Sequence, residues 1–268
     1  MTTDPVDTSL IALAEALVEA SGPIARRYFR TPLVIDDKND DSPVTRADRE
    51  AEAAMRRIIE AERPADGILG EEYGAVRTDA DYVWVLDPID GTRAFINGLP
   101  IFGTLVALTR HGSSILGIID MPALGDRWTG AIGHPPRFTS AGNGEARPKV
   151  RPCAGLGAAR LCSTTPDMFG GTDQTAFDRL TAAVRDTRYG TDCLAYGLVA
   201  SGHTDLVVEA GMQPYDYLAQ VPIIEGAGGV ITDWQGQPLT LDSDGRVVAA
   251  GDAGVHAEAL ALLGNTAV

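Results

Sequence analysis

The sequence predicts an α/β protein, and three observations carry this prediction. In the second half of the chain, strand-like segments alternate with helix-like ones, which is typical of α/β proteins. The first half opens with two segments whose apolar residues recur at helical spacing, and strand-like segments follow them. Hydrophobic residues make up 44% of the 268 residues, so the chain can bury a substantial core.

The first half begins with two predicted helices, over residues 9–30 and 45–62. Asp7 or Thr8 is the expected N-cap of the first helix, and Pro23 is expected to kink or divide it. An apolar stripe along each helix would let it pack against a sheet.

Thr45 and Asp48 begin the second helix and resemble a capping box in which aspartate replaces glutamate. Four strands are predicted after it, and the last three are expected to be antiparallel: residues 82–86, 103–109, 114–120 and 127–132. Gly112 supplies the first turn between these antiparallel strands. Residues 133–152 are rich in glycine, proline and arginine, which indicates a loop or a hairpin.

Predicted strands and helices alternate through the second half. The strands are expected at residues 159–163, 188–190, 205–209, 229–234 and 246–250. The helices are expected at residues 175–186, 193–201, 215–226 and 254–263. We expect one compact unit with two lobes, an N-terminal α+β lobe over residues 1–150 and a C-terminal α/β lobe over residues 151–268.

The net charge of −15 restricts the classes of partner. Nucleic acids and anionic membrane surfaces attract cationic proteins, so neither is an expected partner. No apolar run approaches the roughly 20 residues of a membrane span, and no secretory signal is visible. The scattered cysteines, Cys153, Cys162 and Cys193, indicate neither a disulfide framework nor a zinc site, and we expect a cytoplasmic protein.

The most informative segment is residues 84–92, W-V-L-D-P-I-D-G-T. An apolar strand ends here in Asp87 and Asp90, and two carboxylates at a strand end suit a hard divalent cation. The proline and the glycine favour a turn that aims both carboxylates at one point. If a helix begins at about Thr92, the amides of Gly91 and Thr92 face an anion. The alternative is an ordinary turn in which the aspartates only form hydrogen bonds.

Three further acidic residues lie where one predicted element meets another. Glu71 follows an apolar pair and a glycine, which suggests a strand exit, and a solvated acidic loop is the alternative. Asp48 and Asp216 lie near the starts of predicted helices, where an acid is commonly a cap or a first-turn residue. The carbonyl of Ile89 could also face a cation, because hard metals accept backbone oxygen. All-oxygen ligation favours Mg²⁺ over zinc.

These segments together resemble the inositol monophosphatase family of Mg²⁺-dependent, lithium-sensitive phosphatases. Order and spacing agree over about residues 9–263, nearly the whole chain. The resemblance implies a layered αβαβα sandwich, usually assembled as a homodimer. It rests on P-V-T at 43–45 with Asp48, G-E-E at 70–72, D-P-I-D-G-T at 87–92, and Y-D at 215–216 leading to E-G-A-G-G at 225–229.

The resemblance also implies a role for each candidate residue. Asp48 would assist a weakly held ion, and Gly91 and Thr92 would bind phosphate through their backbone amides. The Thr92 hydroxyl, paired with Glu71 or Asp48, would position the attacking water. The ligands of two to three Mg²⁺ ions would be Glu71, Asp87, the Ile89 carbonyl, Asp90 and Asp216.

Two carboxylates distinguish the leaving-group pocket that the resemblance implies. Asp192 stands where inositol phosphatases usually carry a small residue, and Glu209 stands where the family has a substrate-contacting glutamate. Asp90 and Asp216 are also expected to contact the substrate. Two negative charges suit an ammonium group better than a neutral polyol. For Asp192, the alternative is an N-cap of the helix expected at 193–201.

The expected substrate is therefore a small phosphate monoester, L-histidinol phosphate, because the sequence also resembles the histidinol-phosphatase branch of the family. Arg93 and Ala94 stand where many inositol phosphatases have Thr-Asn. The alternatives are an inositol-1-monophosphatase or a broad sugar-phosphate phosphatase, with a bisphosphate nucleotidase less favoured. A different class of protein, a non-catalytic binder of metal or phospholigand on the same fold, is a further alternative.

Overall fold

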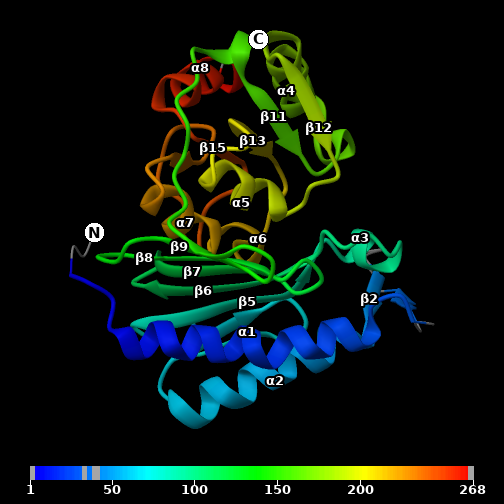
Figure 1. Ribbon diagram of the computed structural model, residues 1–268, viewed down its shortest axis with the longest axis vertical. Helices are drawn as coiled ribbons and strands as arrows, with labels where there is room; N and C mark the ends of the chain where they lie inside the picture. Colours follow the sequence, from blue (N-terminus) through cyan, green and yellow to red (C-terminus); the bar gives the residue numbers. More distant parts are fainter. Residues whose placement is uncertain (1–3, 32–34, 38–42, 265–268) are drawn as a thin grey trace.

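The chain folds into five layers (Figure 1). A computed structural model describes residues 4–31, 35–37 and 43–264. Two long helices cover one face of a large sheet, three short helices lie between it and a second sheet, and two helices cover the outer face of the second sheet. This αβαβα order confirms the predicted fold class.

The large sheet has eight strands in the order β10-β9-β8-β7-β6-β5-β3-β4, in which only the β3–β5 pair is parallel among the described strands. A separate antiparallel pair consists of β1 (Ile35–Asp37) and β2 (Pro43–Thr45). The strands of the large sheet are β3 (Gly67–Gly70), β4 (Gly74–Val76), β5 (Tyr82–Asp90), β6 (Gly103–Arg110), β7 (Ser113–Met121), β8 (Asp126–Ala131), β9 (Arg137–Ser140) and β10 (Gly144–Ala146). The last two strands form the hairpin that was one alternative for residues 133–152.

The second sheet has the order β12-β11-β13-β15-β14, with β12, β11 and β13 parallel. Its strands are β11 (Arg160–Ser163), β12 (Asp186–Tyr189), β13 (Leu206–Glu209), β14 (Val230–Thr232) and β15 (Val247–Ala250). The helices are α1 (Thr8–Tyr28), α2 (Arg46–Glu62), α3 (Thr92–Ile96), α4 (Gly171–Ala183), α5 (Leu194–Ala200), α6 (Pro214–Tyr217), α7 (Gln220–Gly226) and α8 (Ala253–Leu263), with short 3₁₀ turns at Leu156–Ala158 and Pro166–Met168.

The first helix, α1, runs unbroken through Pro23, so the expected division there is wrong. Asp7 is its N-cap, because its carboxylate accepts a hydrogen bond from the Ser9 amide at 2.8 Å. Among the described helices, α1 is the one long and apolar enough to cross a membrane. This contradicts the prediction that no apolar run approaches the length of a membrane span. The apolar side of α1 instead packs against β6, β7 and α2, which is the position of a core helix.

The strand that was expected to end at Leu86 continues as β5 to Asp90. Its pairing with β6 is irregular after Asp87. Asp87 pairs with Leu105 and Asp90 pairs with Gly103, so three steps along β5 correspond to two steps along β6. One extra residue is therefore accommodated in a bulge, which redirects side chains at the strand end. Pro88 lies within this bulge, where its missing N–H costs no ladder bond.

The single helix expected at 215–226 is two helices, α6 and α7. Pro222 has no N–H to donate to the Leu218 carbonyl, and the Ser114 hydroxyl donates to that carbonyl instead at 2.8 Å. The Gln220 side-chain amide donates to the Asp216 carbonyl at 2.5 Å. Side chains thus replace the helical hydrogen bonds where the chain bends.

The bend between α6 and α7 lies directly on the large sheet because two sheet residues are glycines. A Cβ atom on Gly117 would lie 1.9 Å from the Ala219 carbonyl oxygen, and one on Gly130 would lie 2.4 Å from the backbone of Pro222. This close approach brings α6 beside the end of β5. It therefore sets the position of the acidic residue that α6 carries.

Candidate metal and phosphate site

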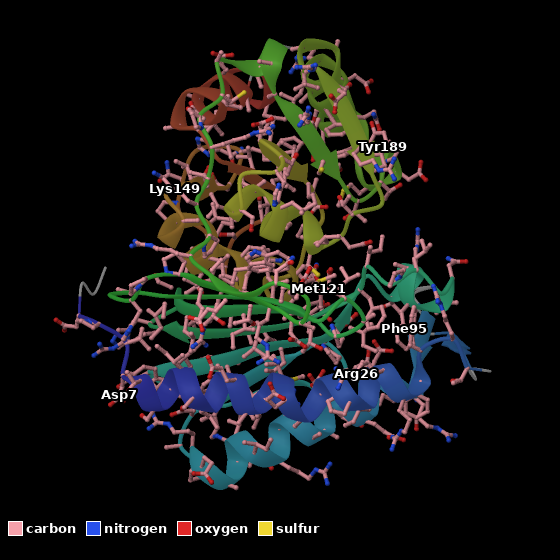
Figure 2. The ribbon with its side chains drawn as sticks, viewed as in Figure 1. Asp7, Arg26, Phe95, Met121, Lys149 and Tyr189 are labelled. Carbon is pink, nitrogen blue, oxygen red and sulfur yellow. The ribbon has the colours of Figure 1, made fainter. Side chains whose placement is uncertain are left out.

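Three predicted ligands meet where the end of β5 lies against α6. Asp87 and Asp90 come from β5 and Asp216 comes from α6, and one carboxylate oxygen of each lies within 4.8 Å of the others. Figure 2 labels two residues that mark this end of the large sheet, Phe95 on α3 and Met121 at the end of β7. Residues distant in sequence are thus brought together at one point.

Asp87 is the most deeply buried member of this group, with 2% of its surface exposed. Its Oδ1 accepts no hydrogen bond from the part of the chain that the structure describes. Burial raises its pKa well above the usual range, and the negative charges of Glu71 and Asp90 add to that shift. A buried carboxylate oxygen among like charges favours a cation as its partner.

Asp90 is held by the backbone of the second half of the chain. Its Oδ2 accepts a hydrogen bond from the Cys193 amide at 2.8 Å. Burial raises its pKa well above the usual range, and the charges of Asp192 and Asp216 act in the same direction. The Cys193 thiol also contacts the Met121 sulfur at 3.7 Å, so the start of α5 is anchored to the large sheet beside the site.

Asp216 combines the ordinary role of a helix acid with a place in the cluster. It is the third residue of α6, and its Oδ2 accepts a hydrogen bond from the Gln213 amide at 2.7 Å. Burial raises its pKa to about 7, and nearby Glu71 contributes to this increase. The capping alternative is therefore correct without excluding a ligand role.

Glu71 and Asp48 border this group of three. Glu71 follows β3, as the predicted strand exit required, and its amide donates to the Leu86 carbonyl at 3.2 Å. Asp48 lies in the first turn of α2 with 1% of its surface exposed. The negative charges of both residues contribute to the raised pKa of Asp87, but neither residue belongs to the three whose oxygens lie within 4.8 Å of one another. The side chain of Thr45, the other half of the expected capping box, lies outside the described residues.

The turn after β5 has the form that the motif predicted. Gly91 is the N-cap of α3 and has a φ of 78°, a left-handed conformation that favours glycine. The helix begins at Thr92, and amides at a helix start have no partner within the helix. The Thr92 hydroxyl donates to the Ile89 carbonyl at 3.0 Å. That carbonyl keeps a second lone pair for another partner.

Asp192 faces the turn at Gly91 and does not cap α5. The N-cap of α5 is Cys193, with no side-chain capping bond among the described residues, so the capping interpretation is wrong. Asp192 has a φ of 43°, and a Cβ atom on Gly91 would lie 3.2 Å from its Cγ. This left-handed residue precedes the helix and directs its carboxylate toward Gly91. Burial raises the pKa of Asp192 to about 6.

A cavity of about 540 Å³ adjoins Asp192. Its wall includes the exposed Arg93, the apolar side chains of Leu99 and Ile101, and Thr164. The cavity therefore lies between residues that follow β5 in the first half of the chain and residues of the second half that include Asp192. Its size suits a small organic group attached to a phosphate.

Glu209 lies deeper than this cavity and is only 2% exposed. Its carboxylate accepts hydrogen bonds from the Thr164 amide at 3.0 Å, the Thr164 hydroxyl at 2.5 Å and the Tyr196 hydroxyl at 2.7 Å. Sequence reasoning missed Thr164 and Tyr196, because neither has a local signal that relates it to Glu209. In this conformation the Glu209 carboxylate is held by the protein itself.

The raised pKa values of Asp216 and Asp192 predict how stability depends on pH without metal. Both groups titrate near 4 when unfolded but at about 7 and about 6 when folded. Between these values the folded chain therefore binds more protons than the unfolded chain. The stability that this difference contributes is complete below pH ~4 and is lost as the pH rises through ~7. We expect the thermal midpoint in EDTA to fall between pH 5 and pH 8.

Mg²⁺ should raise the midpoint more at pH 8 than at pH 5, because it competes with protons for the same oxygens. Calorimetric scans of Asp216→Asn in EDTA should show a weaker dependence on pH. Asp79→Asn, an exposed site, should behave like the unmodified protein. Equal slopes in all three proteins would contradict this prediction.

Comparison with known proteins identifies relatives over almost the whole chain. The sequence profile of the inositol monophosphatase family matches residues 7–266. The chain is 48% identical to the bifunctional phosphatase IMPL2, chloroplastic, of Arabidopsis thaliana, over 93% of this chain and 73% of the relative. It is 35% identical to the histidinol-phosphatase of Chlorobaculum parvum, over 89% of this chain and 91% of the relative.

A solved structure is similar over the same extent. An inositol monophosphatase from Zymomonas mobilis matches with a TM-score of 0.87 and 48% sequence identity. The match covers 96% of this chain and 98% of that chain. The similarity thus includes both sheets and the region between them.

Proposed function

Since the chain belongs to the inositol monophosphatase family, we propose that it is a Mg²⁺-dependent histidinol-phosphatase that releases phosphate from L-histidinol phosphate. A phosphoric monoester hydrolase is the activity that the family supports. The choice of substrate is the proposal. It is supported mainly by the position of Asp192 beside Gly91, in the turn between β5 and α3.

The carboxylate cluster has the properties expected of a Mg²⁺ site. Its donors are oxygen atoms, and Asp87 Oδ1 has no hydrogen-bond donor among the described residues. Burial and repulsion by neighbouring carboxylates raise the pKa values of Asp87, Asp90 and Asp216, and a divalent cation would relieve that repulsion. We propose that Glu71 and the Ile89 carbonyl complete the ligands of two to three ions, with Asp48 assisting a weaker one.

Bound Mg²⁺ would neutralise phosphate oxygens, make water a stronger nucleophile and stabilise the leaving oxygen. The chain supplies the remaining elements of the reaction. The amides of Gly91 and Thr92 would hold the phosphate at the start of α3. The Thr92 hydroxyl already donates its proton to Ile89, so its oxygen can accept from a water molecule. Glu71 or Asp48 would orient that water for attack in line with the bond to the leaving oxygen.

The negative charge of Asp192 would face the organic part of the substrate. Asp192 contacts the Gly91 turn on one side and lines the cavity on the other. An ammonium about 4 Å from a carboxylate is attracted by roughly 4 kcal/mol before desolvation, at an effective dielectric constant of about 20. A neutral polyol gains nothing comparable. The second charge, Glu209, would act from behind Thr164, and rearrangement of its hydrogen bonds would be needed for direct contact.

The relatives support both substrate classes. A relative at 35% identity is named histidinol-phosphatase, whereas a structure at 48% identity is named an inositol monophosphatase. Inositol-1-monophosphatase activity, or a broad activity on sugar phosphates, is therefore the second candidate.

The deciding experiment is a side-by-side measurement of kcat/KM with Mg²⁺ for L-histidinol phosphate and inositol 1-phosphate. We expect a preference for L-histidinol phosphate of roughly tenfold or more, equivalent to ~1.4 kcal/mol. A preference for inositol 1-phosphate would overturn the substrate assignment and leave the phosphatase class in place. No release from either ester would contradict both.

We also propose a homodimer in the cytoplasm. The dimer is supported by the family resemblance, and sedimentation should then give the mass of two chains. The location is supported by three cysteines that form no disulfide within the described residues. Localisation of a tagged chain to an organelle would contradict it.

A further inference from the structure

We propose that Glu52 is a positioning residue that holds Glu71 against the carboxylate cluster. This inference rests on the proposed function, because the role of Glu71 as a metal ligand is part of that proposal. Glu52 lies on α2, is fully buried and has no expected contact with metal or substrate. Its effect would pass through the backbone that carries Glu71.

The Glu52 carboxylate binds the two backbone amides that follow Glu71. Oε2 accepts from the Glu72 amide at 2.7 Å, and Oε1 accepts from the Tyr73 amide at 3.2 Å. The amide of Glu71 itself donates to the Leu86 carbonyl on β5. Hydrogen bonds thus connect the turn to β5 through the amide of Glu71 and to α2 through the two amides that follow it.

Gly70 shows how closely this carboxylate approaches the turn. A Cβ atom at Gly70 would lie 2.0 Å from Glu52 Oε1, so any larger residue would displace the carboxylate. Glu52 therefore contacts the backbone both before and after Glu71. Such contacts fix the direction of the side chain between them.

Arg56 completes the arrangement one turn further along α2. Its Nε donates to Glu52 Oε1 at 2.7 Å, and its Nη2 donates to the Gly74 carbonyl at the end of the turn. The negative charge of Glu52 is therefore paired, as buried charges must be. Asp48 lies one turn before Glu52, on the same side of α2. The helix thus joins the turn that carries Glu71 to a second acid near the cluster.

A purely structural ion pair would have different consequences. Loss of such a pair lowers the stability of the folded chain without changing metal affinity once the chain is folded. A residue that orients a metal ligand changes metal affinity itself, typically by 10–100-fold. Metal binding measured on folded protein therefore separates the two roles.

The test measures Mg²⁺ binding by titration calorimetry without substrate. Glu52→Gln keeps the shape of the side chain but removes its charge, and we expect Mg²⁺ affinity to fall by about tenfold or more. Gly70→Ala keeps the charge and displaces the carboxylate, and we expect a loss of the same kind. Glu60→Gln, an exposed change on the same helix, serves as the control and should bind like the unmodified protein. The circular dichroism spectra at the titration temperature establish that each variant is folded.

A double-mutant cycle with Glu71→Gln tests whether Glu52 acts through Glu71. If it does, adding Glu52→Gln to Glu71→Gln causes little further loss of affinity. Full additivity, or unchanged affinity in both Glu52→Gln and Gly70→Ala, would overturn this inference and leave the proposed function intact. If Glu52→Gln does not fold, Gly70→Ala decides the question. Absence of Mg²⁺ binding by the unmodified protein would overturn the proposed function and this inference with it.

Discussion

Replacement of Asp90 by asparagine is expected to lower phosphate release by about 10²- to 10³-fold with the fold intact. The change removes one negative charge from the cluster that Asp90 forms with Asp87 and Asp216. The asparagine oxygen can still accept the hydrogen bond from the Cys193 amide, so the anchor of α5 remains. The substitution therefore weakens cation binding and slows the phosphate release that depends on the cation.

The measurement is the single-turnover release of phosphate from L-histidinol phosphate at saturating Mg²⁺. Asp79→Asn removes the same charge from an exposed position and should retain activity. Circular dichroism and the thermal midpoint check that Asp90→Asn is folded. Equal release from both variants would show that the cluster is not the catalytic site. No release from the unmodified chain would instead indicate a non-catalytic binder on this fold.

The turn at Gly91, directly after two of the proposed ligands, could be predicted from local sequence because its determinants are contiguous. A proline and a glycine beside Asp87 and Asp90 specify a tight turn, and the left-handed Gly91 follows from the absence of a side chain. The bulge that extends β5 to Asp90 could not be predicted. It depends on the pairing with β6, which local sequence does not specify.

The break between α6 and α7 has a signal in the sequence, but the apolar pattern around it favours a continuous helix. Pro222 indicates a break, yet the apolar residues around it continue at helical spacing. What stabilises the bend is a hydrogen bond from Ser114, which lies on a strand of the large sheet. A contact between such distant segments cannot be derived from periodicity.

The grouping of Asp216 with the aspartates of β5 came from the family resemblance and not from local pattern. Locally, Asp216 is a helix-capping acid, and the structure shows that this role is real. The error at Asp192 has a related cause. The same residue types occur at the N-cap of a helix and at the position before it, so sequence alone does not separate the two. The backbone conformation separates them, and Asp192 has a φ of 43°.

Replacement of Asp192 by asparagine is the change expected to separate the two candidate substrates. We expect kcat/KM for L-histidinol phosphate to fall by about tenfold or more, because an ion pair with the substrate ammonium is lost. For inositol 1-phosphate, which lacks an ammonium, the fall should be small. Asparagine tolerates the left-handed backbone at this position, so the variant should keep the turn. Alanine would add backbone strain to the loss of charge.

The ratio of the two kcat/KM values is the informative quantity. Asp192 also raises the pKa of Asp90, so its removal alters the metal site, but that effect is common to both substrates and cancels in the ratio. Asp167→Asn removes a charge from the exposed rim of the same cavity and should leave the ratio nearly unchanged. Equal losses on both esters with Asp192→Asn would mean that Asp192 acts only on the turn. The source of substrate preference would then have to lie elsewhere in the cavity.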